Sequence, residues 1–121
     1  MRLQESGEMY LETIYILSKS KNNVRAIDVG DRMGFSKPSV SRALSILRNG
    51  GYVETDENGF LSLTETGLER AMKVYERHEI LSRALMEIGV DEDTAIEDAC
   101  RMEHIISDTS FDAIKEHLNK K

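Results

Sequence analysis

The sequence lacks the features that would place the protein in a membrane or outside the cell. It has no run of about 18 apolar residues, the length that a transmembrane helix needs, and no basic-plus-apolar leader at its N-terminus. Its single cysteine, Cys100, cannot form an internal disulfide. We therefore expect a cytoplasmic protein with no membrane partner, in which Cys100 is a buried thiol, a metal ligand or a reactive group.

Motifs of common enzyme classes are also missing. The chain has no glycine-rich phosphate loop, no nucleophile elbow and no HExxH pair, so we do not expect an enzyme. It has no internal repeat and no low-complexity segment either. Its 121 residues suit one domain, or a small domain with an added helical arm.

Charge is distributed unevenly along the chain. The net charge of −6 alone argues against a nucleic-acid partner, since phosphate binding needs lysine and arginine. Residues 1–50, however, carry eight Lys/Arg against five Asp/Glu, a net of +3, whereas residues 51–121 carry eight against seventeen, a net of −9. The first half is therefore suited to face a polyanion, and the second half to hold cations.

The first half contains a predicted helix-turn-helix. Helical spacing of apolar residues predicts helices over 8–18, 24–33 and 37–48. Gly34 is a plausible end for the second helix, and Ser36 and Pro38 provide the capping hydroxyl and first-turn proline of the third. The outer face of the third helix is small, polar and basic, and it includes Lys37, Ser39, Arg42 and Arg48. A short helix, a tight turn and such a second helix form the helix-turn-helix pattern.

A β-hairpin is predicted directly after these helices. Two short alternating segments, 52–55 and 60–63, flank a turn at Asn58-Gly59. A hairpin in this position is the wing of a winged helix, which normally lays its second helix into the major groove of DNA. DNA contact is therefore a better interpretation of the basic outer face than a merely solvated surface.

Three further helices are predicted in the second half, over 64–88, from 92 to about 106, and from 107 onward. The first of them is longer than a winged helix requires and looks like a connector to a second layer. Its predicted buried stripe is Leu68, Ala71, Met72, Tyr75, His78, Leu81, Leu85 and Ile88, and that of the next helix includes Ala95, Ile96, Ala99 and Ile106. A symmetric homodimer through the C-terminal helices would cover the apolar stripes left over.

The most unusual cluster of residues is Cys100, Glu103 and His104. Residues three and four apart share one face of a helix, so all three side chains could reach one cation. Cys100 alone would more often be a core thiol, but mixed clusters of this kind are typical of metal sites. His78 has the same two interpretations, a hydrogen-bonded core histidine or a fourth ligand from a second helix.

Several segments resemble the DtxR/MntR family of metal-dependent transcriptional repressors, in its short two-domain form without an SH3-like domain. They occur in the family's order and cover nearly the whole chain. The segments are 8–15 (EMYLETIY), Val24-Arg25 with Asp28, 36–41 (SKPSVS), 63–67 (LTETG), Arg77-His78, and 98–104 (DACRMEH) with Ser107-Asp108.

The resemblance implies a fold and a set of metal ligands. We expect a mainly α protein with a winged helix-turn-helix DNA-binding domain over residues 1–66, followed by a helical connector, metal-binding and dimerisation domain over residues 67–121. The implied ligands are Met9, Glu12, His78, Cys100, Glu103 and His104. Without the resemblance, Met9 would be a gap filler and Glu12 a solvated side chain. Ser82 and Ile96 stand where iron-type members have ligands of an ancillary site, so that site is not expected in its usual form.

The ligand set is a hybrid of two metal preferences. Met9 and Cys100 are soft donors that favour Fe(II) over Mn(II), while Glu12 adds a hard oxygen. Fe(II) is therefore expected as the cofactor and Mn(II) as the next choice, with Co(II), Ni(II) or Zn(II) as substitutes in vitro. A Mn(II)-specific member of the same family remains an alternative.

The expected function is metal-activated repression of genes for metal uptake, by a homodimer on a palindromic operator in double-stranded DNA. Bases would be read by Ser36, Pro38, Ser39 and Arg42, and phosphates would be bound by Arg25, Lys37 and Arg48. Two alternatives come from other classes. One is a winged-helix regulator that senses a small molecule, and the other is a small metal-binding protein without specific DNA affinity.

Overall fold

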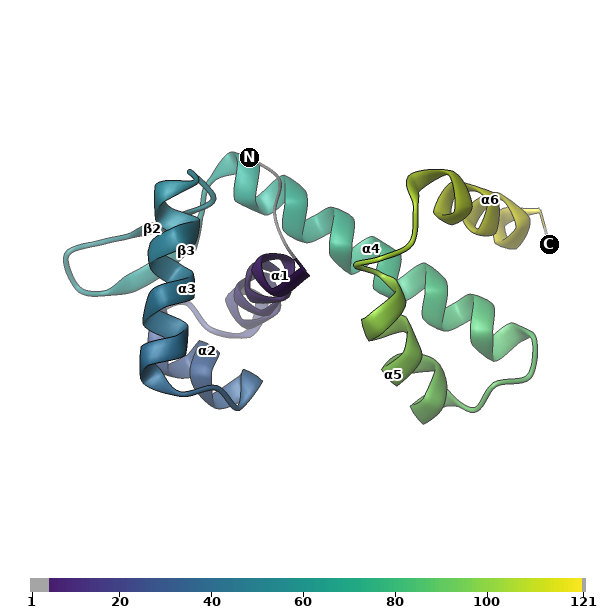
Figure 1. The fold of residues 1–121 in the computed structure, drawn as a ribbon, viewed down its shortest axis with the longest axis horizontal. Helices are drawn as coiled ribbons and strands as arrows, with labels where there is room; N and C mark the ends of the chain where they lie inside the picture. Colours follow the sequence, from purple (N-terminus) through teal and green to yellow (C-terminus); the bar gives the residue numbers. More distant parts are fainter. Residues whose placement is uncertain (1–4, 121) are drawn as a thin grey trace. The chain divides into compact units, whose positions relative to one another are not determined.

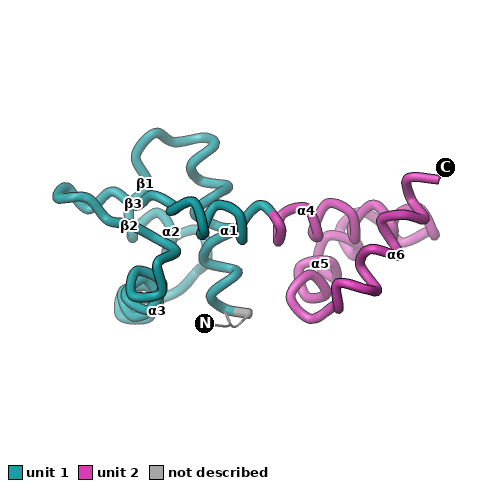
Figure 2. Tube along the Cα trace, turned by 90° about the horizontal axis from the view of Figure 1, so that it is seen from above, with its two compact units in different colours: residues 1–72 teal, residues 73–121 magenta. Residues whose placement is uncertain are grey.

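The computed structural model describes residues 5–120 and, as the sequence predicts, is mainly α-helical with a small β-sheet (Figure 1). Two compact units are formed, the first ending at Met72 and the second beginning at Lys73 within one long helix (Figure 2). In residues 5–120 no helix is both long and apolar enough to cross a membrane. The elements are α1 (Glu5–Ser20), β1 (Val24–Arg25), α2 (Ala26–Met33), α3 (Lys37–Asn49), β2 (Val53–Thr55), β3 (Phe60–Leu63), α4 (Glu65–Glu87), α5 (Glu92–Met102) and α6 (Asp108–Asn119).

Unit 1 is built on a three-stranded antiparallel sheet in the order β1-β3-β2. The predicted hairpin is confirmed, with Val53 of β2 opposite Leu63 of β3. Gly59 in its turn has a φ of 83°, a conformation that favours glycine. The helices and the sheet share one core, whose fully buried members include Leu11, Ile14, Val29, Val40, Leu44 and Leu47.

The predicted helix-turn-helix is formed by α2 and α3. Gly34, with a φ of 74°, ends α2, and Ser36 caps α3 by accepting the Ser39 N–H at 3.4 Å. The two helices approach closely at Gly30, where a Cβ would lie 3.3 Å from both the Phe35 carbonyl oxygen and Val40 Cγ2. A side chain at this position would require these neighbours to move by a few tenths of an ångström.

The predicted second helix begins too early, because its first two residues form β1 instead. Val24 pairs with Leu61 and Arg25 with Phe60 of β3, and the β-branched Val24 is buried in the sheet. The helix starts after Arg25, whose backbone N–H donates to the Asp28 carboxylate at 2.9 Å. This contact is half of a capping box and fixes the first turn of α2.

Asp28 gives unit 1 a pH-dependent contribution to its stability. Lys21 Nζ donates to Asp28 Oδ1 at 2.8 Å, and this bond, with the one from the Arg25 N–H, lowers the pKa of Asp28 below its ordinary 3.8. A depressed folded-state pKa stabilises the fold above the unfolded pKa, and the contribution is lost as pH falls through the folded pKa. We expect Asp28→Ala to lower the free energy of unfolding by about 1 kcal/mol at neutral pH, and by less toward a pH of about 2.

Urea unfolding at the two pH values measures this effect. Asp31→Ala is the control, since Asp31 is an exposed carboxylate on the same helix, and its effect should not change in the same way. An equal loss of stability from Asp28→Ala at both pH values would contradict the role given to the two hydrogen bonds.

Hydrogen bonds of Thr64 join the start of α4 to the residues before β2. Thr64 Oγ1 donates to the Gly51 carbonyl at 2.6 Å and accepts the Gly67 N–H at 3.0 Å, while the Thr64 N–H donates to the Tyr52 carbonyl at 3.1 Å. Gly67 is buried, and a Cβ there would lie 1.9 Å from the Tyr52 carbonyl oxygen. Only glycine fits without a backbone movement.

Unit 2 consists of the remainder of α4 with α5 and α6 around a small core. As predicted, Asp91 and Ser107 cap α5 and α6, accepting the N–H groups of Thr94 and Ser110. An ion pair between Glu76 and Lys115, at 3.2 Å, also joins α4 to α6. The buried core residues are Ile80 and Leu81 of α4, Ala99 of α5, and Phe111 and Leu118 of α6.

The single buried stripe predicted along residues 64–88 is wrong. Leu68, Met72 and Ile88 are 39%, 50% and 80% exposed, whereas Val74 and Ile80, which lie off the stripe, are buried. The reason is that α4 contributes to two units with separate cores. Its buried face therefore does not follow one continuous line.

The predicted extent of the fifth helix is also wrong. The helix ends at Met102 rather than near Ile106, and Ile96, predicted to face inward, is 39% exposed. The chain turns over residues 103–106, where Arg77 binds the carbonyl oxygens of Glu103 and Ile106, and Ser107 already caps the next helix. These contacts replace the further helical turn that the sequence pattern predicts.

Candidate metal centre and nucleic-acid interface

Four of the six predicted metal ligands come together in unit 2. His78 Nδ1 lies 3.0 Å from Glu103 Oε2 and 3.7 Å from Cys100 Sγ. His104 Nε2 lies 3.2 Å from Glu103 Oε1. The Glu103 carboxylate therefore stands between two imidazoles, with the thiol beside one of them. We call these four residues the unit 2 donor set.

Two helices and a turn position the donor set. His78 lies on α4, and Cys100 lies in the last turn of α5. Glu103 is the C-cap of α5, and its N–H donates to the Ala99 carbonyl, while His104 follows in the turn. The sequence predicts all three C-terminal donors on one helical face, whereas the structure places only Cys100 on the helix itself.

Because it is buried, the Glu103 carboxylate of the donor set requires a positive charge nearby. The side chains of Glu103 and His104 are each 1% exposed, and that of His78 is 20% exposed. Removing a carboxylate from water is costly unless an opposite charge or hydrogen bonds compensate for it. A protonated imidazole or a shared cation would supply that charge.

The three known separations between neighbouring donor atoms are close to those found around a divalent cation. Metal–ligand bonds of about 2.0–2.3 Å in a tetrahedral arrangement place neighbouring donors roughly 3.3–3.8 Å apart, and the observed separations are 3.0, 3.2 and 3.7 Å. Thiolate, imidazole and carboxylate are also the ligands that first-row transition metals use. Cys100 is exposed, so the alternative of a buried core thiol is wrong.

The remaining predicted ligands, Met9 and Glu12, lie on α1 in unit 1. They are three residues apart and share one side of the helix. Met9 is 37% exposed and Glu12 is half-buried. Met9 therefore does not fill a gap in the unit 1 core.

Ser82 and Ile96, at the two positions of the ancillary site, are not typical metal ligands. Ser82 is 6% exposed and its Oγ has no hydrogen-bond partner among the described residues, while Ile96 offers no donor atom at all. Neither side chain supplies the carboxylate or imidazole that divalent transition metals prefer. His78 instead contacts Glu103 and Cys100, as described above.

The predicted DNA-reading face of α3 is exposed. Ser36 lies at its N-cap, and Lys37, Pro38, Ser39 and Arg42 are exposed on the helix itself. The opposite face is buried in the unit 1 core through Val40, Leu44 and Leu47. The orientation of α3 is the one that its sequence periodicity predicts, with the polar and basic face directed to solvent.

The other two predicted phosphate contacts, Arg25 and Arg48, also contact the hairpin. The Arg25 Cζ lies 4.5 Å from the centroid of the Phe60 ring, and Arg48 Nη1 donates to Thr55 Oγ1 at 3.0 Å. Both arginines remain exposed. Arg25 lies on β1 and is the N-cap of α2, rather than within the predicted helix.

The acidic character of the wing is not among the features predicted from the sequence. Residues 53–63 contain Glu54, Asp56 and Glu57 and no lysine or arginine, and all three carboxylates are exposed. Counting charge for each element, rather than for each half of the chain, would have found them. Like charge repels phosphate, so the basic face of α3 is a better DNA-binding surface than the wing.

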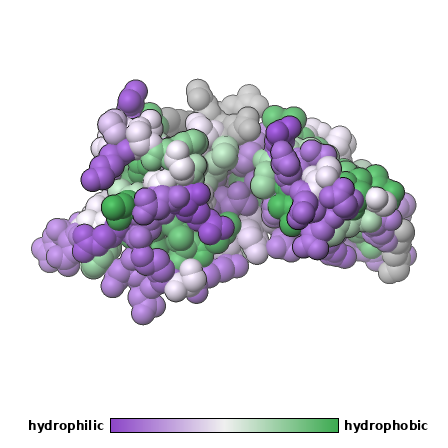
Figure 3. Space-filling view, turned by 90° about the horizontal axis from the view of Figure 1, so that it is seen from below, coloured by the Kyte–Doolittle hydropathy of each residue, from purple (hydrophilic) through white to green (hydrophobic). Residues whose placement is uncertain are grey.

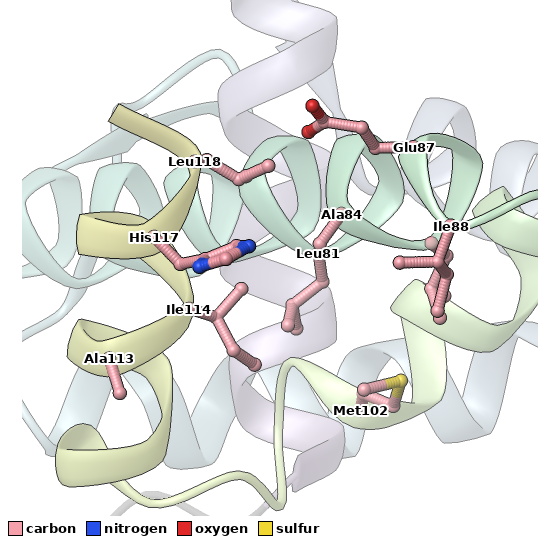
Figure 4. A pocket seen from close by; sticks show the side chains of 10 residues that line it. Leu81, Ala84, Glu87, Ile88, Met102, Ala113, Ile114, His117 and Leu118 are labelled. Carbon is pink, nitrogen blue, oxygen red and sulfur yellow. The ribbon is translucent and has the colours of Figure 1, made fainter. Parts of the chain in front are cut away.

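Unit 2 has both exposed apolar residues and an apolar pocket. Met86, Ile88 and Ile105 are 38%, 80% and 73% exposed, and apolar patches interrupt the hydrophilic surface on the face drawn in Figure 3. A pocket of about 370 Å³ lies between α4, α6 and the end of α5. In Figure 4 Ile114 and His117 extend into it from α6, toward Leu81 of α4. Exposed apolar patches commonly mark protein–protein interfaces.

Most of the chain matches one protein family. Residues 2–60 match the N-terminal DNA-binding domain of iron-dependent repressors. Residues 64–121 match the metal-binding and dimerisation domain of the same family. The exposed face of α3 lies in the first match, and the unit 2 donor set lies in the second.

Individual relatives agree with this match. The chain is 32% identical over 120 residues to an uncharacterised HTH-type transcriptional regulator of Methanocaldococcus jannaschii, covering 98% of this chain and 96% of the relative. It is 33% identical over 107 residues to the diphtheria toxin repressor of Corynebacterium diphtheriae, covering 88% of this chain and 47% of the repressor. The solved structure of the manganese regulator SloR, 27% identical, matches with a TM-score of 0.84 over 100% of this chain and 56% of SloR. The chain thus spans about half the length of the last two proteins.

Proposed function

Because the chain belongs to the family of iron-dependent, DtxR/MntR-type repressors, we propose that it is a metal-activated transcriptional repressor with Fe(II) as its preferred cation and Mn(II) as the next. Metal-dependent repression is the character of the family. The observation that carries the proposal for this chain is the buried Glu103 carboxylate between His78 and His104, with Cys100 beside His78. The protein would act in the cytoplasm, where a thiol ligand stays reduced.

The cation would be held by the unit 2 donor set together with Met9 and Glu12 of α1. A divalent cation there would offset the charge of the Glu103 carboxylate. Two features support Met9 and Glu12 as ligands: the Met9 side chain is exposed, and the two side chains lie on the same side of α1. Cys100 and Met9 are soft ligands, which favours Fe(II) over Mn(II). Co(II), Ni(II) and Zn(II) would bind the same residues in vitro.

In a homodimer, metal would act on DNA binding by restricting the positions of the two DNA-binding units, which are unit 1 of each subunit. Ligands from α1 and from unit 2 on one cation would restrict the DNA-reading helices to fewer arrangements, including one that fits two half-sites of a palindrome about one DNA turn apart. Linkage then makes metal and DNA increase each other's affinity, typically by about 1–3 kcal/mol. The exposed apolar residues of unit 2 support a dimer interface through the C-terminal helices. Repression of metal-uptake genes at high metal would follow.

Operator binding with and without metal tests the proposal. Duplexes selected from a random-sequence pool under anaerobic conditions with Fe(II) should bind the chain at least roughly fivefold more tightly with metal than with a chelator. Equal affinity in both conditions would refute metal control and favour a regulator that senses a small molecule. Metal binding without any sequence-dependent DNA binding would instead indicate a small metal-binding protein.

Cys100→Glu tests the choice between iron and manganese. Replacing a soft thiolate with a hard carboxylate should move the preference toward Mn(II), by roughly tenfold or more in the ratio of the two affinities. Anaerobic competition between Fe(II) and Mn(II) measures that ratio. Asn119→Glu, at an exposed position in the last turn of α6 and outside the donor set, controls for added charge. An unchanged ratio in Cys100→Glu would contradict the role of the thiol.

Arg42 and Lys37 are expected to affect DNA binding in different ways. Arg42→Ala should cost about 1–3 kcal/mol on the selected duplex and relax its sequence preference. Lys37→Ala should weaken binding to all sequences and reduce the slope of log affinity against log salt by about 1. Titrations on specific and random duplexes at several salt concentrations measure both effects. Equal losses on every sequence for both variants would contradict the division into base and phosphate contacts.

A further inference from the structure

Arg77, the residue before His78, makes contacts that metal binding by the donor set does not by itself explain. Its Nη1 donates to the carbonyl oxygens of Glu103 at 3.2 Å and Ile106 at 2.8 Å. Its Nη2 pairs with Asp108 Oδ1 in the first turn of α6. One guanidinium therefore binds the turn that carries Glu103 and His104 at both of its ends, and also the helix that follows.

The environment of Arg77 favours the contacts with the turn. Its side chain is 11% exposed, and its Cζ lies 5.4 Å from the centroid of the Phe111 ring. Asp108, by contrast, is 68% exposed, so water screens much of that ion pair. The planar guanidinium has five donors in a fixed arrangement, which suits it to bind two carbonyl oxygens at set positions.

The turn needs such a partner because α5 ends at Met102. The last carbonyl groups of a helix lack intrahelical partners. Here the Met102 carbonyl accepts the N–H groups of Ile105 and Ile106, whereas the carbonyls of Glu103 and Ile106 in the turn accept from Arg77. The direction of the Glu103 and His104 side chains depends on this backbone. Arg77 Nη1 binds it on both sides of His104, at Glu103 and at Ile106.

Stabilisation of the fold alone explains Arg77 poorly. Its Nε–H is buried and has no hydrogen-bond partner among the described residues, and a buried donor without a partner is destabilising. The ion pair between Glu76 and Lys115 already joins α4 to α6 at a different point. An apolar side chain in the place of Arg77 would avoid the buried N–H, but it would not bind the turn.

We infer that Arg77 is a positioning residue of the metal centre, which holds the Glu103 carboxylate and the His104 imidazole in their binding positions before a cation arrives. The inference rests on the proposed metal-binding function and adds a residue outside the ligand set. Ligands that are already ordered lose less conformational freedom on binding. Removing a residue that orients metal ligands typically lowers metal affinity by about 10–100-fold.

Two substitutions of Arg77 and one matched control test this role. Arg77→Lys keeps the charge and an ion pair with Asp108 but loses the two-carbonyl contact, and Arg77→Met keeps only the apolar stem. Lys115→Met removes a separate ion pair between α4 and α6, the one with Glu76, and leaves the turn untouched. Co(II) is the probe, because the absorption of a Co(II)–thiolate bond reports on Cys100. Hydrogen exchange of the amides of residues 103–106 without metal reports on the turn itself.

Both Arg77 variants should bind Co(II) about 10–100-fold more weakly than the wild type, and their turn amides should exchange faster without metal. Lys115→Met should match the wild type in both measurements. Unchanged Co(II) affinity in folded Arg77→Lys and Arg77→Met, or equal weakening in Lys115→Met, would overturn the inference. Failure of both Arg77 variants to fold, judged by circular dichroism, would assign Arg77 to stability and overturn it too. A wild-type chain that binds no Co(II) would instead refute the proposed function, which is a separate outcome.

Discussion

Glu103→Gln is expected to abolish metal-dependent DNA binding while leaving the chain folded. The carboxylate is the one group of the donor set that lies within 3.2 Å of both imidazoles. Glutamine keeps its shape and removes its charge, so a cation would lose a ligand and much of the negative charge that attracts it. We expect the affinity for Co(II) or Fe(II) to fall roughly 100-fold or more, at least the upper end of what loss of an orienting residue costs.

Glu97→Gln is the matched control for Glu103→Gln. It makes the same chemical change on α5, the helix that ends at the residue before Glu103, at a side chain that is 70% exposed and paired with Arg101, itself 75% exposed. Exposed pairs of this kind contribute little to stability, about 0.3–0.5 kcal/mol on a helix. Isothermal titration with the metal and DNA-binding assays with and without it give the two readouts. Wild-type metal affinity in Glu103→Gln would remove the central ligand from the proposed site.

The second large effect is expected from Gly67→Ala, which should destabilise unit 1. The added Cβ would lie 1.9 Å from the Tyr52 carbonyl oxygen and 2.9 Å from its carbonyl carbon. Both are backbone atoms next to β2, so the clash cannot be relieved by a change of rotamer. Overpacking typically costs 1–3 kcal/mol, and a backbone clash places this variant at roughly 3 kcal/mol or above.

Gly34→Ala separates a steric clash from a conformational preference. Gly34 has a φ of 74°, but no atom lies within 4 Å of the position that its Cβ would take. A left-handed conformation costs a residue with a side chain about 1–2 kcal/mol. Thermal or urea unfolding should therefore show a clearly larger loss for Gly67→Ala than for Gly34→Ala. Equal losses would mean that α4 can move away from Tyr52 at little cost.

Local sequence signals predict most of the fold of unit 1. Ser36 and Pro38 mark the start of α3, and Asn58-Gly59 marks the turn of the hairpin, because both depend on the residues in place and their immediate neighbours. β1 could not be predicted in the same way. A strand of two residues has no periodicity, and Val24 and Arg25 are extended because they pair with Leu61 and Phe60, more than thirty residues away in the sequence.

The residue types of the candidate metal centre were predicted, but their arrangement was only partly so. Spacing alone placed Cys100, Glu103 and His104 near one another, and the structure brings them together with His78. The turn after Met102 is not predicted, and its carbonyl groups are bound by Arg77, which is separated from Glu103 by 26 positions. A contact over such a distance leaves no local pattern in the sequence.

Because the turn after α5 depends on contacts from α4, the donor set is not expected to bind metal outside this fold. A peptide of residues 91–108 would contain Cys100, Glu103 and His104, yet it would lack both His78 and the arginine that binds the turn. We expect the same segment grafted onto another helix to be a poor chelator. A nascent or unfolded chain would then bind scarce metal only weakly. Only molecules whose second unit has already folded would respond to the metal concentration in the cell.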